Sequence, residues 1–426
     1  MINADNGGFE NLSLTDIKVL FISLAVFIVL FFAGRVFLGS KSKPAIQVFF
    51  GLLVIYVFFL LGSLVIKGFS TLFPLIFLIA LSLLGIWLSR KTIKGDIISL
   101  FISLVLVTPF LFLAVVMNNP LWDDYSHWIP SAQFLTNHGN LPNLDEPVIN
   151  HSRPSYPYAR ALIHSFVNLP LNDFAMNVQG IFNILFASTL LLWAKPIIEL
   201  YGKNKWGNFA LLALMGTLSS LLLIWTITLN TRLVISSYAD PSFSIVIAHL
   251  FIFLTLSKYD ENRFEKGIFD PVLAGLFMLP VVIKDVGFYY SIIIFLSYWT
   301  VFEGPLFFKD TRSLLKIKIL TIQISHLLPL FLFHYLWSFY LNANEIKQDF
   351  PLRWFDENRL TLIPKIVDAA EAQILGRPYV IIAFFLIILY LLFSKTKKKQ
   401  NPVSSKAIVV MGLVLSMGVI VFHLMA

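Results

Sequence analysis

The chain has 426 residues, of which 58% are hydrophobic and only 13% are charged, and its mean hydropathy is +0.80. Soluble domains carry about 25% charged residues, so this composition excludes an ordinary soluble protein. Apolar runs of about 20 residues, the length a helix needs to cross a bilayer core of about 30 Å, recur along the sequence. The sequence therefore predicts an all-α polytopic membrane protein.

The formal net charge is +8 and the pI is near 9.4. The basic residues lie in short loops between apolar runs, as they do in cytoplasmic membrane loops, so nucleic acid is not expected as a partner. The chain has no cysteine, which excludes disulfides, thiolate metal sites and cysteine nucleophiles. Residues 1–16 are polar and acidic, so the apolar run that follows is predicted to be a first span rather than a signal peptide.

Four spans are predicted before the first long polar interval: residues 17–38, 44–66, 71–88 and 97–117. The first and third loops between them are basic, whereas the second holds only Lys67. Because cytoplasmic loops carry an excess of Lys and Arg, the first and third loops are predicted to be cytoplasmic. The polar interval 118–171, with four of the eight histidines, is then predicted to be extracytoplasmic.

The remaining predicted spans are residues 174–200, 207–229, 240–256, 271–283, 286–302, 319–341, 379–393 and 407–424. The total is about 12 transmembrane helices, within a range of 11 to 13. Five regions follow: N-terminal transmembrane helices (1–117), a first extracytoplasmic loop with catalytic acids (118–171), a central bundle (172–341), a second extracytoplasmic loop (342–376) and C-terminal helices (377–426). Helices lying on the membrane surface are predicted at 125–136 and 360–375, one in each extracytoplasmic loop.

The apolar run 271–302 is too long for one ordinary span and short for two. Basic loops flank it on both sides, so both of its ends are predicted to be cytoplasmic. Two short spans that turn at Lys284 and Asp285 near the outer face satisfy this condition. A first arm of this length must either tilt or end at a water-filled cavity inside the membrane.

The predicted topology gathers five ionisable residues from distant parts of the chain at the outer face: Asp123, Asp124, Asp240, Lys284 and Asp285. Ionisable side chains at or within a membrane are costly, and they usually pair or line a functional cavity. A shared cavity with carboxylates and a cation suits a phosphorylated lipid and a hydroxyl or amine acceptor.

Three short motifs carry these residues: WDDYSHW (122–128), YAD (238–240) and KDVG (284–287). A fourth motif, SYPY (155–158), lies between the first two. In their order and in their predicted location on one side of the membrane, these motifs resemble those of the GT-C superfamily of polyprenyl-phosphate-sugar-dependent glycosyltransferases, in its bacterial integral membrane form. Two features depart from that pattern. Asp124 and Asp285 stand where a glutamate is common, and several spans precede the catalytic loop.

The resemblance implies a GT-C-like fold and an inverting glycosyltransferase of the bacterial inner (cytoplasmic) membrane, with its active site on the extracytoplasmic side. A sugar would move from a polyprenyl-phosphate donor to an extracytoplasmic cell-envelope glycan, glycolipid or protein. Asp123 would act as the general base, with Asp124 as a second base or orienting the acceptor. Lys284 would bind the donor phosphate as a point charge. The rest of the implied donor-binding set is Arg153, Arg160, Asp240, Asp285, Tyr156 and His127.

Each assignment has a structural alternative. One of the acids Asp123 and Asp124 could cap a helix that starts near residue 125. Asp240 could simply begin a span, and Lys284 and Asp285 could form a structural ion pair. Trp122, Trp128, Tyr156 and Tyr158 could form an interfacial aromatic belt rather than sugar-stacking platforms, and Arg353, Arg359 and Arg377 could contact lipid headgroups.

No cofactor or metal is required by the sequence. His127 is interpreted as hydrogen-bonding an aspartate or lying at the interface, although with Asp123 and Asp124 it could hold a divalent cation such as Mg²⁺ or Mn²⁺. Two rival functions remain open. A transporter or flippase for a lipid-linked sugar would place charges in mid-span and interrupt helices, and an O-antigen ligase or polymerase would centre on arginine and histidine in a later loop.

Overall fold

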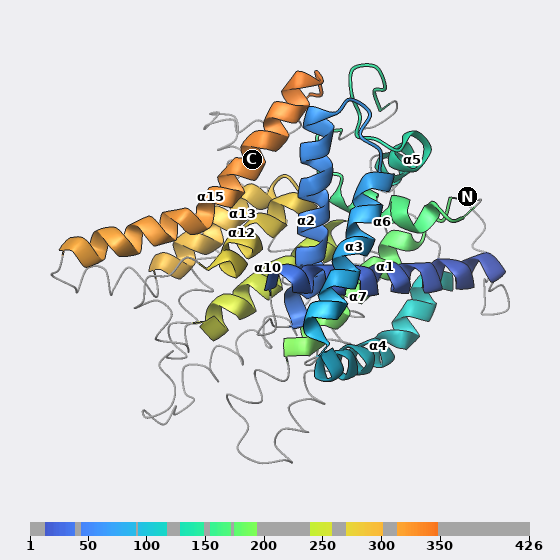
Figure 1. The fold of residues 1–426 in the computed structure, drawn as a ribbon, viewed down its shortest axis with the longest axis horizontal. Coiled ribbons are helices and arrows are strands. Elements are labelled where there is room, and N and C mark those ends of the chain that lie inside the picture. Colours follow the sequence, from blue (N-terminus) through green and yellow to red (C-terminus); the bar gives the residue numbers. More distant parts are fainter. Residues whose placement is uncertain are drawn as a thin grey trace, which may run out of the picture. The chain divides into compact units, whose positions relative to one another are not determined.

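The computed structural model describes residues 13–38, 44–90, 93–116, 128–148, 154–171, 174–193, 239–257, 270–300 and 313–347. Throughout these ranges the regular secondary structure is helical, without a strand (Figure 1). Among the described residues, five helices are long and apolar enough to cross a membrane: α1 (Leu14–Leu38), α2 (Pro44–Val65), α3 (Leu72–Ser89), α4 (Ile93–Val116) and the segment Leu320–Ala343 of α15 (Ser313–Ala343). The protein is therefore a helical membrane protein by length and composition.

Four parts of the predicted topology lie outside the described residues: the spans 207–229, 379–393 and 407–424, and the surface helix 360–375. The count of about twelve spans and the GT-C fold therefore stay predictions.

The helices α1 to α4 begin and end close to the four predicted N-terminal spans. A capping box starts α1: Ser13 Oγ accepts from the backbone N–H of Asp16 at 3.1 Å, and the Asp16 carboxylate accepts from the Ser13 N–H at 3.1 Å.

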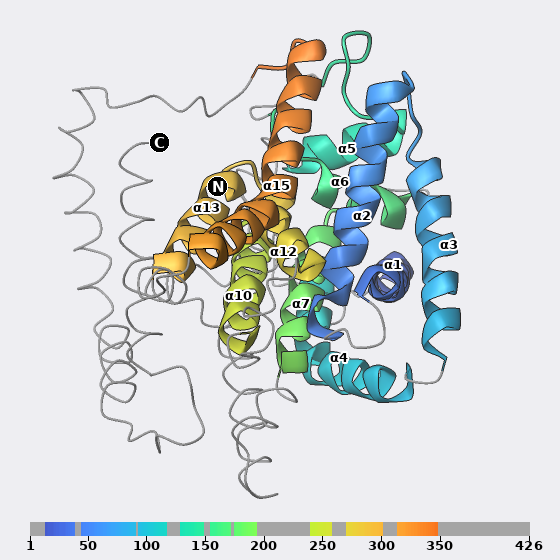
Figure 2. The same cartoon turned by 60° about the vertical axis from the view of Figure 1, so that its left-hand side comes forward.

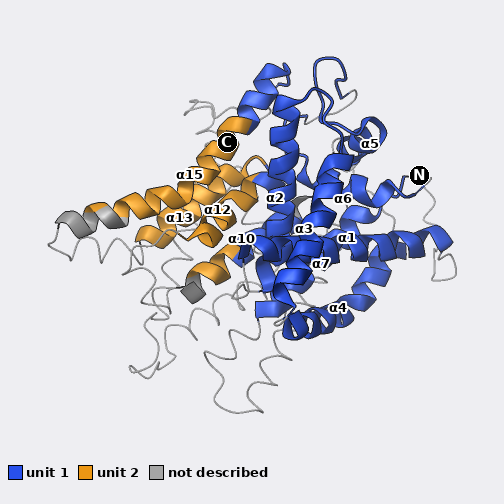
Figure 3. Cartoon of the chain, in the orientation of Figure 1, with its two compact units in different colours: residues 1–249, 282–284, 337–347 blue, residues 250–281, 285–336, 348–426 orange. Residues whose placement is uncertain are grey.

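The chain divides into two compact units (Figure 3). The first contains residues 1–249, 282–284 and 337–347, and the second contains residues 250–281, 285–336 and 348–426. The first unit holds α1 to α7 and the start of α10 (Ala239–Ser257). Helix α5 (Ile129–His138) packs on α6 (Ala159–Asn168), and α4 packs on α7 (Val178–Ser188), which continues as the 3₁₀ helix η3 (Thr189–Trp193).

Glycines allow α1 to run across α2 and α3 at close range, as Figures 1 and 2 show. A Cβ atom at Gly34 of α1 would overlap the carbonyl of Gln47 in α2, and one at Gly51 of α2 would overlap the backbone of Leu30. Gly85 of α3 lies equally close to the α1 backbone. Small residues at such crossings let helix backbones approach within lipid, where packing rather than the hydrophobic effect drives association.

An ion pair joins the last turn of α1 to the first turn of α4. Arg35 is only 3% exposed, and its guanidinium donates to the Asp96 carboxylate. The basic-loop argument predicted the same side of the membrane for both helix ends, and they lie together. A buried arginine without this carboxylate would leave an uncompensated charge, so the pair holds α4 on the first three helices.

The second unit is built on a helical hairpin and part of α15. Its arms are α12 (Pro271–Ile283) and α13 (Gly287–Tyr298), close to the two predicted short spans, and the turn falls at Lys284 to Val286 as predicted. Ser291 Oγ of α13 donates to the Phe277 carbonyl of α12 at 2.7 Å. Helix α15 contains Pro329 and bends near its middle (Figure 1).

We expect Gly34→Ala to destabilise the protein by about 1–3 kcal/mol, because the added methyl group must displace the Gln47 backbone. Gly95→Ala in α4 is the matched control, since no atom lies within 4 Å of the added Cβ. Alanine favours helix by up to about 1 kcal/mol over glycine, so Gly95→Ala should stabilise. Unfolding of detergent-solubilised protein, followed by tryptophan fluorescence, measures both. Equal midpoints for the two variants would contradict the tight crossing.

Candidate functional site

The candidate site lies around α6, a helix that sequence reasoning missed. The interval 118–171 was predicted to be an exposed polar loop, but all ten residues of α6 are buried. Its polar residues Arg160, His164 and Asn168 follow each other at intervals of four and so share one helix face. That spacing was the available signal. A polar stripe buried inside the protein must find its hydrogen bonds there.

Arg160 is 1% exposed and is held at both ends by α7. Its Nη2 donates to Asn183 Oδ1 at 3.1 Å, and Gln179 Nε2, one turn earlier on α7, donates to the Arg160 carbonyl at 2.7 Å. Ser242 Oγ of α10 donates to the same Asn183 oxygen at 2.6 Å. Asn183 therefore connects the start of α6 to the first turn of α10, where Asp240 lies two residues before Ser242.

Trp128, the last residue of the WDDYSHW motif, lies between two residues of the predicted site. Its ring stacks on Tyr156 with centroids 5.1 Å apart, and the Arg160 guanidinium carbon lies 5.6 Å from the Trp128 centroid. A desolvated cation–π contact contributes up to about 2 kcal/mol. We call Tyr156, Trp128 and Arg160 the aromatic–arginine stack. It fixes the end of the acidic motif to α6.

The stack corrects the interpretation of its aromatic residues as an interfacial belt or as sugar platforms. Trp128, Tyr156 and Tyr158 are 6%, 7% and 1% exposed, so they are packed inside the protein. The Tyr158 N–H donates to the phenol of Tyr56 in α2 at 2.9 Å. Burial raises the pKa of Tyr158 above its usual value, so its phenol stays protonated.

The end of α15 completes the surroundings of the SYPY motif. Trp337 Nε1 donates to the Ser155 carbonyl at 2.9 Å, and Tyr340 Oη donates to the Pro142 carbonyl at 2.7 Å. Trp337 and Tyr340 stack at 5.7 Å, and Tyr158 lies 6.3 Å from Trp337. Contacts far apart in sequence thus hold the motif in one conformation.

His164 is buried in its neutral form. Its Nε2 donates to the Ala175 carbonyl at 2.7 Å and its ring stacks on Phe174 at 4.7 Å. Burial lowers the pKa of His164 to about 4; the bond to Ala175 opposes this shift, and the positive charge of Arg160 adds to it. Its Nδ1 is buried and finds no hydrogen-bond partner within the described ranges.

The predicted site residues are distributed as follows. Asp123, Asp124, His127 and Arg153 lie outside the described residues. Tyr156 and Arg160 are brought together on Trp128, and Asp240 lies in the first turn of α10, two residues before Ser242. Lys284 belongs to the first compact unit with these residues, and Asp285 belongs to the second.

Asp285 has a structural contact: its carboxylate accepts from the N–H of Val286 at 2.8 Å, next to the start of α13. Within the ranges that the structure describes, no cluster of three His, Asp or Glu side chains could hold a metal ion. The residues suggested as divalent-cation ligands, Asp123, Asp124 and His127, are not among those described.

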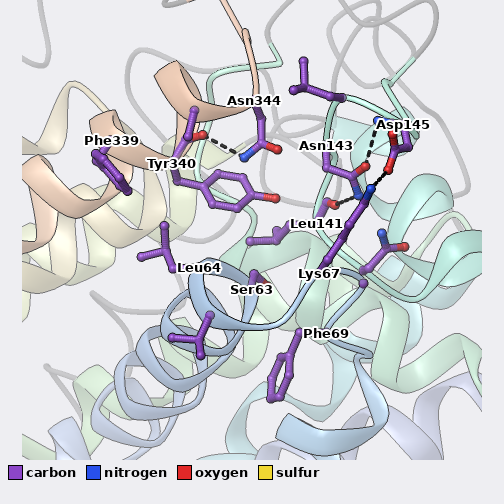
Figure 4. Close-up of a pocket in the computed structure, with 15 residues that line it drawn as sticks. Ser63, Leu64, Lys67, Phe69, Leu141, Asn143, Asp145, Phe339, Tyr340 and Asn344 are labelled. Carbon is purple, nitrogen blue, oxygen red and sulfur yellow. Dashed lines mark hydrogen bonds and ion pairs between the residues drawn. The ribbon is translucent and has the colours of Figure 1, made fainter.

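A separate pocket of about 510 Å³ lies between the end of α2, the segment 140–145 and the end of α15 (Figure 4). Lys67 reaches an ion pair with Asp145 on one side, and Tyr340 and Asn344 lie on the other. None of the predicted site residues lines it. The segments that meet here were all predicted to be extracytoplasmic, so the topology places them consistently on one side.

No protein-family model, curated protein or solved structure matches this chain. The function must therefore be argued from the residues and their arrangement.

We expect Arg160→Lys to lower the free energy of unfolding by roughly 1–3 kcal/mol, because an ammonium cannot both stack on Trp128 and bond the Asn183 amide. Arg90→Lys is the matched control, since Arg90 also lies over a tryptophan, Trp87, at 5.9 Å but at the exposed end of α3. Its midpoint should stay unchanged. A similar loss in both variants would show that burial of the stack contributes nothing.

Stability should fall as the pH drops from 6.5 towards 4. In this range the unfolded chain protonates His164, whereas the folded protein keeps it neutral, so protons favour unfolding. The loss attributable to His164 is at most about 3 kcal/mol. His164→Gln should flatten the profile, measured as unfolding midpoint against pH. His138→Gln, at an exposed position on α5, should keep the slope of the parent protein.

Proposed function

We propose that this protein is an inverting glycosyltransferase that moves a sugar from a polyprenyl-phosphate donor to an acceptor at the extracytoplasmic face of a bacterial inner membrane. The observation that supports this most is the aromatic–arginine stack. It joins two of the motifs on which the resemblance to the GT-C superfamily rests, the end of WDDYSHW and the segment from Tyr156 to Arg160.

The stack gives its members a positioning role. Arg160 and Tyr156 are buried, so they act on the reaction through Trp128 rather than by touching the donor. Trp128 follows Asp123 by five positions, so fixing its ring limits the conformations open to the acidic segment. Catalytic groups need to be held close to their reactive geometry, and a supporting shell of packed residues provides this.

The proposed reaction is a single displacement. The Asp123 carboxylate takes the proton from the acceptor hydroxyl or amine, whose lone pair attacks the anomeric carbon on the face opposite the phosphate. The bond from that carbon to the phosphate oxygen breaks, and its electron pair stays on the departing lipid phosphate. Lys284 stabilises this negative charge, and Asp124 orients the acceptor. The configuration at the anomeric carbon inverts.

Interrupted helices favour one rival, a transporter or flippase for a lipid-linked sugar. Helix α7 passes into the 3₁₀ helix η3, and α12 and α13 are short. The buried histidine of this region argues for a structural role instead. Trp193 Nε1 donates to His249 Nδ1 at 2.7 Å, and His249 Nε2 bonds Thr189 Oγ1 at 2.8 Å, so both ring nitrogens are already bonded within the protein.

The experiment that tests the proposal is a transfer assay with purified protein in lipid, a panel of polyprenyl-phosphate sugars and a mixture of cell-envelope acceptors. Donor-dependent glycosylation of an acceptor is expected. Movement of the intact lipid-linked sugar across the bilayer without transfer would favour the rival.

Asp123→Asn should lower the transfer rate by at least about a hundredfold, since an amide cannot accept the acceptor's proton. Asp145→Asn is the matched control, because Asp145 lies in the same predicted extracytoplasmic interval but is exposed and paired with Lys67. It should transfer at the rate of the parent. Near-normal turnover by a well-folded Asp123→Asn variant would remove Asp123 as the base.

A further inference from the structure

The hairpin of α12 and α13 is too short to reach across a membrane. Its arms contain 13 and 12 residues. At 1.5 Å per residue each arm is about 20 Å long, whereas the hydrocarbon core is about 30 Å thick. An arm that begins at one boundary of the core therefore ends about 10 Å short of the other.

Contacts with α15 locate both ends of the hairpin. At its base, the backbone N–H of Asp270 donates to His326 Nε2 at 2.9 Å. Near its tip, Phe288 stacks on His334 with centroids 4.1 Å apart and meets Phe331 edge-on at 5.3 Å. His326 and His334 are eight positions apart, or about 12 Å of helix. The contacts of the hairpin with α15 therefore fall between His326 and His334.

The tip lies at the middle of the α15 span. The apolar span of α15 runs from Leu320 to Ala343, and Phe331 is at its centre. Nine residues, or about 14 Å of helix, follow His334 before the span ends. A turn at this level of α15 would lie inside the membrane rather than near the outer face, where the loop charges alone had placed it.

The two arms leave no passage for water between them. A Cβ atom at Gly287 would overlap the backbone of Pro280, so the chain is in van der Waals contact directly below the turn. Ser291 bonds the Phe277 carbonyl, and the Phe277 ring packs against Phe295 at 5.7 Å. Water therefore does not reach the tip between the two arms.

The tip nevertheless carries two ionisable residues. Lys284, Asp285 and Val286 are all partly exposed. A charged side chain exposed to hydrocarbon near the bilayer centre costs several kcal/mol, and such residues usually face protein or a water-filled cavity. Irregular backbone at membrane depth is tolerated under the same condition.

We propose that α12 and α13 form a re-entrant hairpin that enters and leaves the membrane on the cytoplasmic side, and that Lys284 and Asp285 at its tip line a water-filled cavity open to the extracytoplasmic side. The basic residues that flank the run, Arg263 and Lys266 before it and Lys309 and Arg312 after it, place both ends on one side. A re-entrant hairpin also leaves both ends of the run on the same side of the membrane. It removes two crossings from the predicted number of transmembrane spans. The inference is independent of the proposed transfer reaction.

Single cysteines test it, because the natural chain has none. Val286→Cys probes the tip, and Lys284→Cys is a second tip variant in case the first does not fold. Two positions serve as controls: Leu332→Cys at an exposed apolar position of α15 near the depth of the tip, and Lys67→Cys in an exposed loop. Each folded variant is treated, in spheroplasts and in inside-out vesicles, with a small membrane-impermeant methanethiosulfonate and with a large polyethylene-glycol maleimide.

Tip cysteines should react with the small reagent in spheroplasts at least about tenfold faster than Leu332→Cys, because only a hydrated thiol ionises readily. They should not react with the large reagent, whereas Lys67→Cys should react with both. Labelling of the tip by the large reagent would mean a turn at the membrane surface. Absence of labelling would mean a dry tip, and labelling only in inside-out vesicles would mean a cavity open to the other side. Each of these three results overturns the proposal.

Discussion

The contact on which the first unit depends is the one between the Arg160 guanidinium and the Asn183 amide. A buried charge is tolerated only where its donors are directed at fixed acceptors, and Asn183 provides such an acceptor from α7 while also binding Ser242 of α10. Trp128 covers the guanidinium. Three segments separated in the sequence are therefore held by one polar centre, and the acidic motif ends at its edge.

A polar group that is buried without a partner is costly, so buried polar side chains find their hydrogen bonds within the protein. The stripe on α6 illustrates this. Arg160 bonds α7, His164 bonds the Ala175 carbonyl, and Asn168 accepts from the Ala175 N–H at 2.9 Å. The helix is thereby fixed in rotation as well as in position.

Apolar length and loop charge were sufficient to predict the four N-terminal helices and the hairpin turn, because both follow from the thickness of the bilayer and from the distribution of Lys and Arg. They were insufficient for α6, because a short polar helix buried inside the protein has the composition of a loop. They also could not distinguish a turn at the surface from a turn inside the membrane, since the parity of the flanking loops is the same. Tyr156 and Arg160 were both assigned to the predicted site, but their burial beside Trp128 depends on tertiary contacts that the sequence does not show.

Two ion pairs in the first unit bear on the topology that the loop charges predict. Arg35 and Asp96 connect two helix ends predicted to be cytoplasmic, and Lys67 and Asp145 connect two segments predicted to be extracytoplasmic. Two candidate membrane spans separate the members of each pair: α2 and α3 lie between Arg35 and Asp96, and α3 and α4 lie between Lys67 and Asp145. Both pairs are therefore consistent with α2, α3 and α4 as three successive crossings. Trp128 belongs to the same predicted extracytoplasmic interval as Asp145, and this is the side on which the proposed chemistry would take place.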